Sequence, residues 1–270
     1  MRSTGRASRP RAPTHRGARG APDPGSALCC RTPSRRASIL GRGSHAPHTP
    51  RRPFDTLPWC SVRYPLVLLV LASLLFVSLA IAPPDRLTWA LENTLVLVGL
   101  ALLWATRRTL EFSNLAYTLM FAFFVLHEIG AFYTYTLVPY DRWWQALTGS
   151  SLDAYFGWRR NQYDRLVHFA FGALLAYPMR ELFMRLIAAR GWVSYALPIQ
   201  MTLSWSAIYE LIEWLAASVF GADTGAAYVG AQGDAWDAQK DMALAASGAV
   251  LAMLAASTFR ALREAAHPTA

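Results

Sequence analysis

The stretch Asn161-Gln-Tyr163-Asp164-Arg165-Leu-Val-His168-Phe169 opens a long apolar run that continues to Ile187. Asp164 and His168 lie four residues apart, so a helix places both side chains on one face. Ionisable groups are costly at a membrane boundary, and those found there are candidates for function. The stretch therefore predicts a membrane helix with a polar site at its start.

The whole chain shares this bias toward apolar and aromatic side chains. Of its 270 residues, 54% are hydrophobic and 16% are charged, whereas soluble domains carry about 25% charged residues. Ten Trp and eleven Tyr suit a protein whose aromatic side chains lie at the membrane–water interface. The composition favours a membrane protein, with the lipid bilayer as its surroundings.

The net charge of +9 comes from the first 60 residues, which hold twelve Arg and two acidic residues. Residues 61–270 hold fourteen basic and fifteen acidic residues. Residues 1–60 are rich in Arg, Pro, Ser and Gly and poor in apolar side chains, so we expect a disordered basic tail. Nucleic-acid binding needs a folded basic surface with aromatic side chains, which this tail lacks, so no nucleic-acid partner is expected.

Six apolar segments follow the tail, each of about the 20 residues that cross a bilayer as a helix. Hydrocarbon offers the backbone no hydrogen-bond partners, so the segments must be helical. Pro83-Pro84 ends the first segment and Pro139 ends the third. The six predicted helices cover residues 64–82, 87–105, 115–138, 163–187, 195–219 and 241–262.

The orientation follows from the placement of the basic residues, which favour the inner side of a membrane. With the N-terminus inside, the inner loops hold Arg107, Arg108, Arg180, Arg185, Arg190, Arg260 and Arg263. The two long outer loops then hold most of the loop acids, and Trp143, Trp144 and Trp158 suit an outer aromatic belt. We therefore predict an all-α, polytopic membrane helix bundle with both termini inside, formed by one domain over residues 61–264.

In this topology almost every ionisable residue of the helices falls in the outer half, within a slab about 15 Å deep. Asp164 and His168 open the fourth segment, and Glu210 and Glu213, three residues apart, lie in the outer half of the fifth. The others are Glu92, His127 and Glu128 in the second and third segments, and the stripe of Asp234, Asp237 and Asp241 that leads into the sixth.

These side chains suit two kinds of chemistry. Carboxylates with imidazole are ligands for Mg²⁺, Mn²⁺ or Zn²⁺, and the predicted metal ligands are Asp164, His168, Glu210, Asp237 and Asp241. Carboxylates and imidazoles also serve as general acids and bases or as a proton relay, and the predicted catalytic residues are Asp164, His168, Glu210, Glu213, His127 and Glu128.

Structural roles are open for the same residues. An aspartate such as Asp164 is favoured in the first turn of any helix by the helix dipole. Glu210 and Glu213 could pair with arginines of neighbouring helices. The small residues Ala245, Gly248, Ala249 and Ala252 predict close packing between helices.

Four ordered blocks of the sequence resemble the YjdF-type inner-membrane proteins, a family of unknown function (DUF2238). The blocks are Leu126-His127-Glu128-Ile-Gly130-Ala-Phe-Tyr133-Thr-Tyr135, Arg160–Phe169, Tyr209-Glu210-Leu-Ile-Glu213-Trp214, and Gly230-Ala-Gln232-Gly233-Asp234-Ala-Trp236-Asp237-Ala-Gln239-Lys240-Asp241-Met242. The resemblance covers about residues 64–262 and implies a multi-pass protein of the bacterial inner (cytoplasmic) membrane.

More loosely, the pattern is similar to VanZ-like membrane proteins, which show an Asp-x3-His helix start, a Glu on the next helix and an Asp that opens the last. Asp164, His168, Glu210 and either Asp237 or Asp241 fit those positions. Neither resemblance implies a particular reaction.

Three hypotheses about function follow. The first is an envelope enzyme, a hydrolase or transferase, that acts on a lipid-linked or amphiphilic substrate at the outer leaflet. The second is a non-catalytic membrane scaffold or lipid-binding protein, in which the polar cluster fixes the helix bundle. The third is a proton-coupled transporter that uses Glu92, His127 and Glu128.

Overall fold

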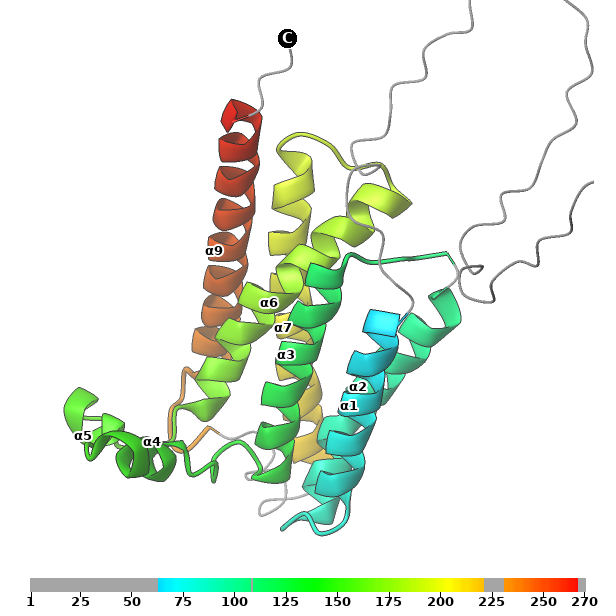
Figure 1. Ribbon diagram of the computed structural model, residues 1–270. Coiled ribbons are helices and arrows are strands. Elements are labelled where there is room, and N and C mark those ends of the chain that lie inside the picture. Colours follow the sequence, from blue (N-terminus) through cyan, green and yellow to red (C-terminus); the bar gives the residue numbers. More distant parts are fainter. Residues whose placement is uncertain (1–62, 108, 221–230, 267–270) are drawn as a thin grey trace, which may run out of the picture. The chain divides into compact units, whose positions relative to one another are not determined.

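Each of the six predicted segments forms one helix in the computed structural model, which describes residues 63–107, 109–220 and 231–266. The six helices are α1 (Arg63–Ala80), α2 (Arg86–Thr106), α3 (Asn114–Phe132), α6 (Tyr163–Leu186), α7 (Val193–Phe220) and α9 (Asp237–Ala266) (Figure 1). Two shorter helices, α4 (Tyr140–Thr148) and α5 (Leu152–Phe156), lie between α3 and α6 and were not predicted. The described ranges contain no strand, which confirms the all-α prediction.

The described residues belong to one unit, Arg52–Ala270. The predicted disordered tail, residues 1–60, lies outside the described residues. The predicted domain of residues 61–264 and its boundaries therefore stay a prediction.

Helix α3 ends at Phe132, about six residues before the predicted end at residue 138. The chain turns there because Thr134 and Tyr135 take left-handed backbone conformations, with φ of 52° and 53°. This turn folds the Tyr135 ring back over Gly130, where an added Cβ would lie 2.5 Å from the ring. The apolar run continues past the turn, so its length alone overstated the helix.

Small residues bring α6 and α9 into close contact. An ideal Cβ at Gly172 of α6 would lie 1.8 Å from the backbone oxygen of Ala245, and one at Gly248 of α9 would lie 2.2 Å from that of Phe169. Ala245 and Ala249 are completely buried. These contacts confirm the predicted close packing at the small-residue stripe.

Helix α6 is the central element of the described bundle. It packs most extensively against α9 and also contacts α3 and α7, while α7 contacts α9 as well (Figure 1). Because α6 is covered by three helices, four of its ionisable residues are buried: Asp164, His168, Arg180 and Glu181.

The other end of α6 differs from the prediction. Arg180, assigned above to an inner loop, is buried within α6, and so is Glu181. Glu181 accepts hydrogen bonds from the backbone N–H and the hydroxyl of Ser113, the N-cap of α3 (2.9 and 2.5 Å), and from Arg185 (3.1 Å). Ionisable residues are thus not confined to one half of the bundle.

Among the described helices, α1, α2, α3 and α9 are long and apolar enough to cross a membrane. Helices α6 and α7 are not among these four. Six crossings and an orientation with both termini inside therefore stay predictions.

Candidate metal and acid–base site

The geometry of the site begins with Asn161, which lies just before α6 and fixes its start. Its side-chain oxygen accepts from the N–H of Tyr163 (2.9 Å), and its side-chain amide donates to the carbonyl of Val138 (2.8 Å). The Tyr163 hydroxyl donates to the carbonyl of Leu126 on α3 (3.0 Å). The first turn of α6, which carries Asp164, is thereby tied to α3 and to the chain that follows it.

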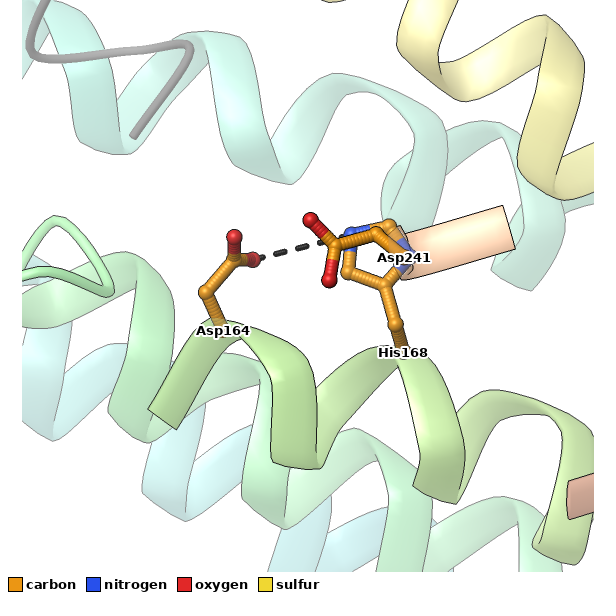
Figure 2. A group of neighbouring side chains, drawn as sticks. All are labelled: Asp164, His168 and Asp241. Carbon is orange, nitrogen blue, oxygen red and sulfur yellow. Dashed lines mark ion pairs between the residues drawn. The ribbon is translucent and has the colours of Figure 1, made fainter. Parts of the chain in front are cut away.

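Asp164, His168 and Asp241 meet between α6 and α9 (Figure 2). Each offers one ligand atom, and the three atoms lie within 4.8 Å of one another. The Nε2 atom of His168 lies 3.6 Å from Oδ1 of Asp164 and 3.6 Å from Oε1 of Glu210 on α7. All three helices therefore contribute a carboxylate within reach of one imidazole.

The spacing of these atoms suits a bound ion better than direct hydrogen bonds. A separation of 3.6 Å exceeds hydrogen-bond distance, whereas two ligands at about 2.1 Å from a tetrahedral ion lie about 3.4 Å apart. Oδ1 of Asp241 and Oε1 of Glu210 are buried and accept no hydrogen bond from the described residues. An ion held by Asp164, His168 and Asp241 would supply a partner for the Asp241 carboxylate after a small inward movement, and Glu210 would remain beside the His168 imidazole.

Asp237, predicted as a metal ligand, has other partners in the structure. Its carboxylate pairs with Arg160, and its Oδ1 lies 3.4 Å from Arg165. Asp234, the third acid of the predicted stripe, accepts from Arg165 (2.5 Å) and Lys240 (2.6 Å). Helix α9 begins at Asp237, so Asp234 lies in the preceding turn.

The hydrogen bond from the Lys240 ammonium has the largest effect on the pKa of the Asp234 carboxyl. With the backbone N–H of Trp236 and the Arg165 guanidinium, it lowers the pKa of the Asp234 carboxyl to about 2. This carboxylate stays charged at every physiological pH and holds the loop before α9 to α6.

Glu213 lies one turn beyond Glu210 on α7 and is buried. The preceding Tyr209 donates its hydroxyl to Glu92 of α2 (2.6 Å), and its ring lies edge-on to the His168 imidazole at 6.0 Å between ring centres. Tyr209 therefore joins the buried carboxylate of α2 to the His168 side of the site.

His127 and Glu128 of α3 do not belong to the group of three possible metal ligands. Nδ1 of His127 shares a 2.6 Å hydrogen bond with the Tyr135 hydroxyl, which is possible because α3 ends early. Glu128 is completely buried, and neither carboxylate oxygen has a hydrogen-bond partner within the described part of the chain. Their predicted catalytic role stays a prediction.

Two contributions were missed from the sequence. Arg160 stands directly before the opening stretch, but its pairing with Asp237 joins positions 77 residues apart. Tyr209 directly precedes Glu210 in the sequence, and this position beside a predicted site residue on a membrane helix could have marked it as part of the site.

Comparison with known proteins supports the sequence-based assignment. The family model described as "Predicted membrane protein (DUF2238)" matches residues 64–261. The chain is 36% identical over 188 residues to Inner membrane protein YjdF of Escherichia coli (strain K12), which covers 69% of this chain and 86% of the relative. No solved structure matches.

These matches confirm a membrane protein and the predicted location in a bacterial inner membrane. The looser resemblance to VanZ-like proteins stays a prediction. Because the family match spans all four sequence blocks and every helix of the site, the chain belongs to the DUF2238 family of predicted membrane proteins.

Proposed function

We propose that the chain is a metal-dependent membrane enzyme in which Asp164, His168 and Asp241 hold one divalent cation. The observation that carries this proposal is the convergence of their three ligand atoms within 4.8 Å, between two helices that pack tightly together. Two carboxylates and an imidazole suit Mn²⁺ or Zn²⁺, and Mg²⁺ when water completes the set.

Charge balance supports a bound cation. Neither Asp164 nor Asp241 forms an ion pair with an Arg or Lys within the described ranges, whereas Asp234 and Asp237 take up Arg160, Arg165 and Lys240. Buried carboxylates without a positive partner are strongly unfavourable in a protein interior. A divalent cation would neutralise the charges of Asp164 and Asp241.

The proposed reaction is hydrolysis or group transfer on a lipid-linked or amphiphilic substrate at the outer leaflet. When bound, the cation would supply a Lewis acid that polarises the substrate and activates water. Glu210, beside the His168 imidazole, is placed to take up or return a proton, and Glu213 one turn further could pass it on. The proposal rests on the side chains at the starts of α6 and α9, which lie where headgroups meet the hydrocarbon in the predicted topology.

Metal analysis of the purified protein tests the proposal. We expect about one equivalent of Mn²⁺ or Zn²⁺ in the wild-type protein, and less than a tenth of that in Asp164→Asn, His168→Ala and Asp241→Asn. Asp237→Asn is the matched control, because Asp237 pairs with arginines and should not be needed for the metal. Added metal should also raise the melting temperature of the metal-free wild type. Folded wild type that neither contains metal nor responds to Mg²⁺, Mn²⁺ or Zn²⁺ would refute the proposal.

The scaffold hypothesis is favoured by a different observation, the ion-pair network that joins the starts of α6 and α9 through Arg160, Arg165, Asp234 and Asp237. A purely structural cluster predicts that changes at Asp164 and at Asp237 lower abundance and melting temperature to a similar extent. Metal loss confined to the Asp164, His168 and Asp241 variants would separate the two hypotheses.

A further inference from the structure

Where α6 and α9 pack together, each helix carries a basic residue directly beside a proposed metal ligand. Arg165 directly follows Asp164 on α6, and Lys240 directly precedes Asp241 on α9. Neighbouring residues of a helix point about 100° apart, and Asp164 and Asp241 are buried while the Lys240 side chain is half exposed. At the α6–α9 contact the carboxylates of Asp164 and Asp241 therefore lie within the bundle, and the basic side chains of Arg165 and Lys240 lie toward the surface.

A surface groove of about 390 Å³ lies on this basic side, lined by Arg165, Lys240, Ala243, Leu244 and Ser247. The four α9 residues stand at i, i+3, i+4 and i+7, so they form one stripe of the helix. At a rise of 1.5 Å per residue the stripe extends about 10 Å along α9, from the basic end past the apolar Ala243 and Leu244 to Ser247. The groove is therefore amphiphilic along its length.

Two cationic side chains lie together at the basic end of the groove. Of the residues that line the groove, Arg165 and Lys240 supply two positive charges, and Asp234, which pairs with both, supplies one negative charge beside them. Asp234 accepts from both Arg165 and Lys240 and so holds the two cations at the same end of the groove. No acidic residue is among those that line the groove.

We infer that this groove binds a phospholipid with an anionic headgroup. The lipid phosphate would contact Lys240 and Arg165, and an acyl chain would lie along Ala243 and Leu244. The length and polarity of the groove fit a headgroup with the first part of its chain, and the exposed apolar residues of α9, among them Val250, Leu251 and Leu254, continue a lipid-facing surface beyond it. No residue that lines the groove is a proposed metal ligand, so lipid binding and metal binding can be measured separately.

Native mass spectrometry of the detergent-purified full chain tests the inference, with phosphatidylglycerol and diacylglycerol of identical chains as the probes. We expect phosphatidylglycerol to bind at least tenfold more tightly than diacylglycerol. A basic residue near an anionic lipid surface contributes about a fivefold change in affinity, so Lys240→Gln should weaken phosphatidylglycerol binding by about that factor. Arg263→Ala, which removes a positive charge at the far end of α9, is the matched control and should bind as the wild type does.

Leu244→Trp is a second variant that fills the groove and leaves every charge in place. It should weaken phosphatidylglycerol binding at least as much as Lys240→Gln, while both variants keep the wild-type metal content. Equal binding of the two lipids, equal losses in Lys240→Gln and Arg263→Ala, or undiminished binding by Leu244→Trp would each overturn the inference. Failure of the metal proposal would appear separately, as a metal-free wild type that still distinguishes the two lipids.

Discussion

Replacing Gly172 by alanine tests whether the α6–α9 contact sets the geometry of the metal ligands. The new Cβ would lie 1.8 Å from the backbone oxygen of Ala245, and ordinary contacts begin at 3.4 Å, so the helices must separate by about 1.6 Å. Ala245 lies one helical turn from Asp241, so the same shift moves the Asp241 carboxylate away from Asp164. Metal–ligand distances tolerate changes of only about 0.2 Å, and we therefore expect Gly172→Ala to lose the bound metal.

The same substitution should lower the free energy of unfolding by about 1–3 kcal/mol, the usual cost of an overpacked core. Gly99→Ala in α2 is the matched control, because a Cβ there meets no atom within 4 Å. Alanine is preferred to glycine inside a helix by about 1 kcal/mol, so this control should be as stable as the wild type or more stable. The measurements are thermal unfolding in detergent and metal content. A Gly172→Ala protein with wild-type metal and the melting temperature of Gly99→Ala would refute the reasoning.

Two further predictions concern polar groups beside the site. Tyr209→Phe removes the hydroxyl that donates to the buried Glu92 carboxylate, so we expect a loss of about 1–3 kcal/mol in the free energy of unfolding. Tyr64→Phe, which breaks an exposed hydrogen bond, should cost less, and equal losses would contradict the buried role. Lys240 and its neighbours lower the pKa of Asp234 from 3.8 to about 2, so its contribution to stability is complete above about pH 4 and is lost as the pH falls through 2. Melting temperatures measured from pH 6 to pH 2 should therefore fall more steeply for the wild type than for Asp234→Asn, and parallel curves would count against the linkage.

The helices of the membrane domain could be predicted because long apolar runs leave the backbone no alternative to helix. The start of α6 was predicted for the same reason, and the spacing of Asp164 and His168 placed both side chains on one face. The end of α3 was predicted wrongly, because residues 133–138 continue the apolar pattern although Thr134 and Tyr135 turn the backbone. Helices α4 and α5 were missed because they are short and their side chains are mixed in polarity.

The choice between Asp237 and Asp241 shows what the sequence could not supply for the site. The two residues are four apart on α9, so helical spacing places both on the same face. The structure separates them through Arg160, which pairs with Asp237 and leaves Asp241 beside His168. That distinction depends on a contact between residues 77 positions apart, which no local pattern encodes.

The order of synthesis matters for α6, because the helix against which it packs most extensively is made after it. Helices α6 and α7 are synthesised before α9, the last helix described. Neither is among the four described helices that are long and apolar enough to cross a membrane. Until α9 arrives, the face of α6 that carries Gly172 and Asp164 lacks the surface against which it packs. In a nascent chain that stops before α9, α6 would still pack against α3 and α7, but its α9-facing side would be open to the insertion machinery and to membrane proteases. Loss of α1, which contacts mainly α3, would leave the α6–α9 pair complete.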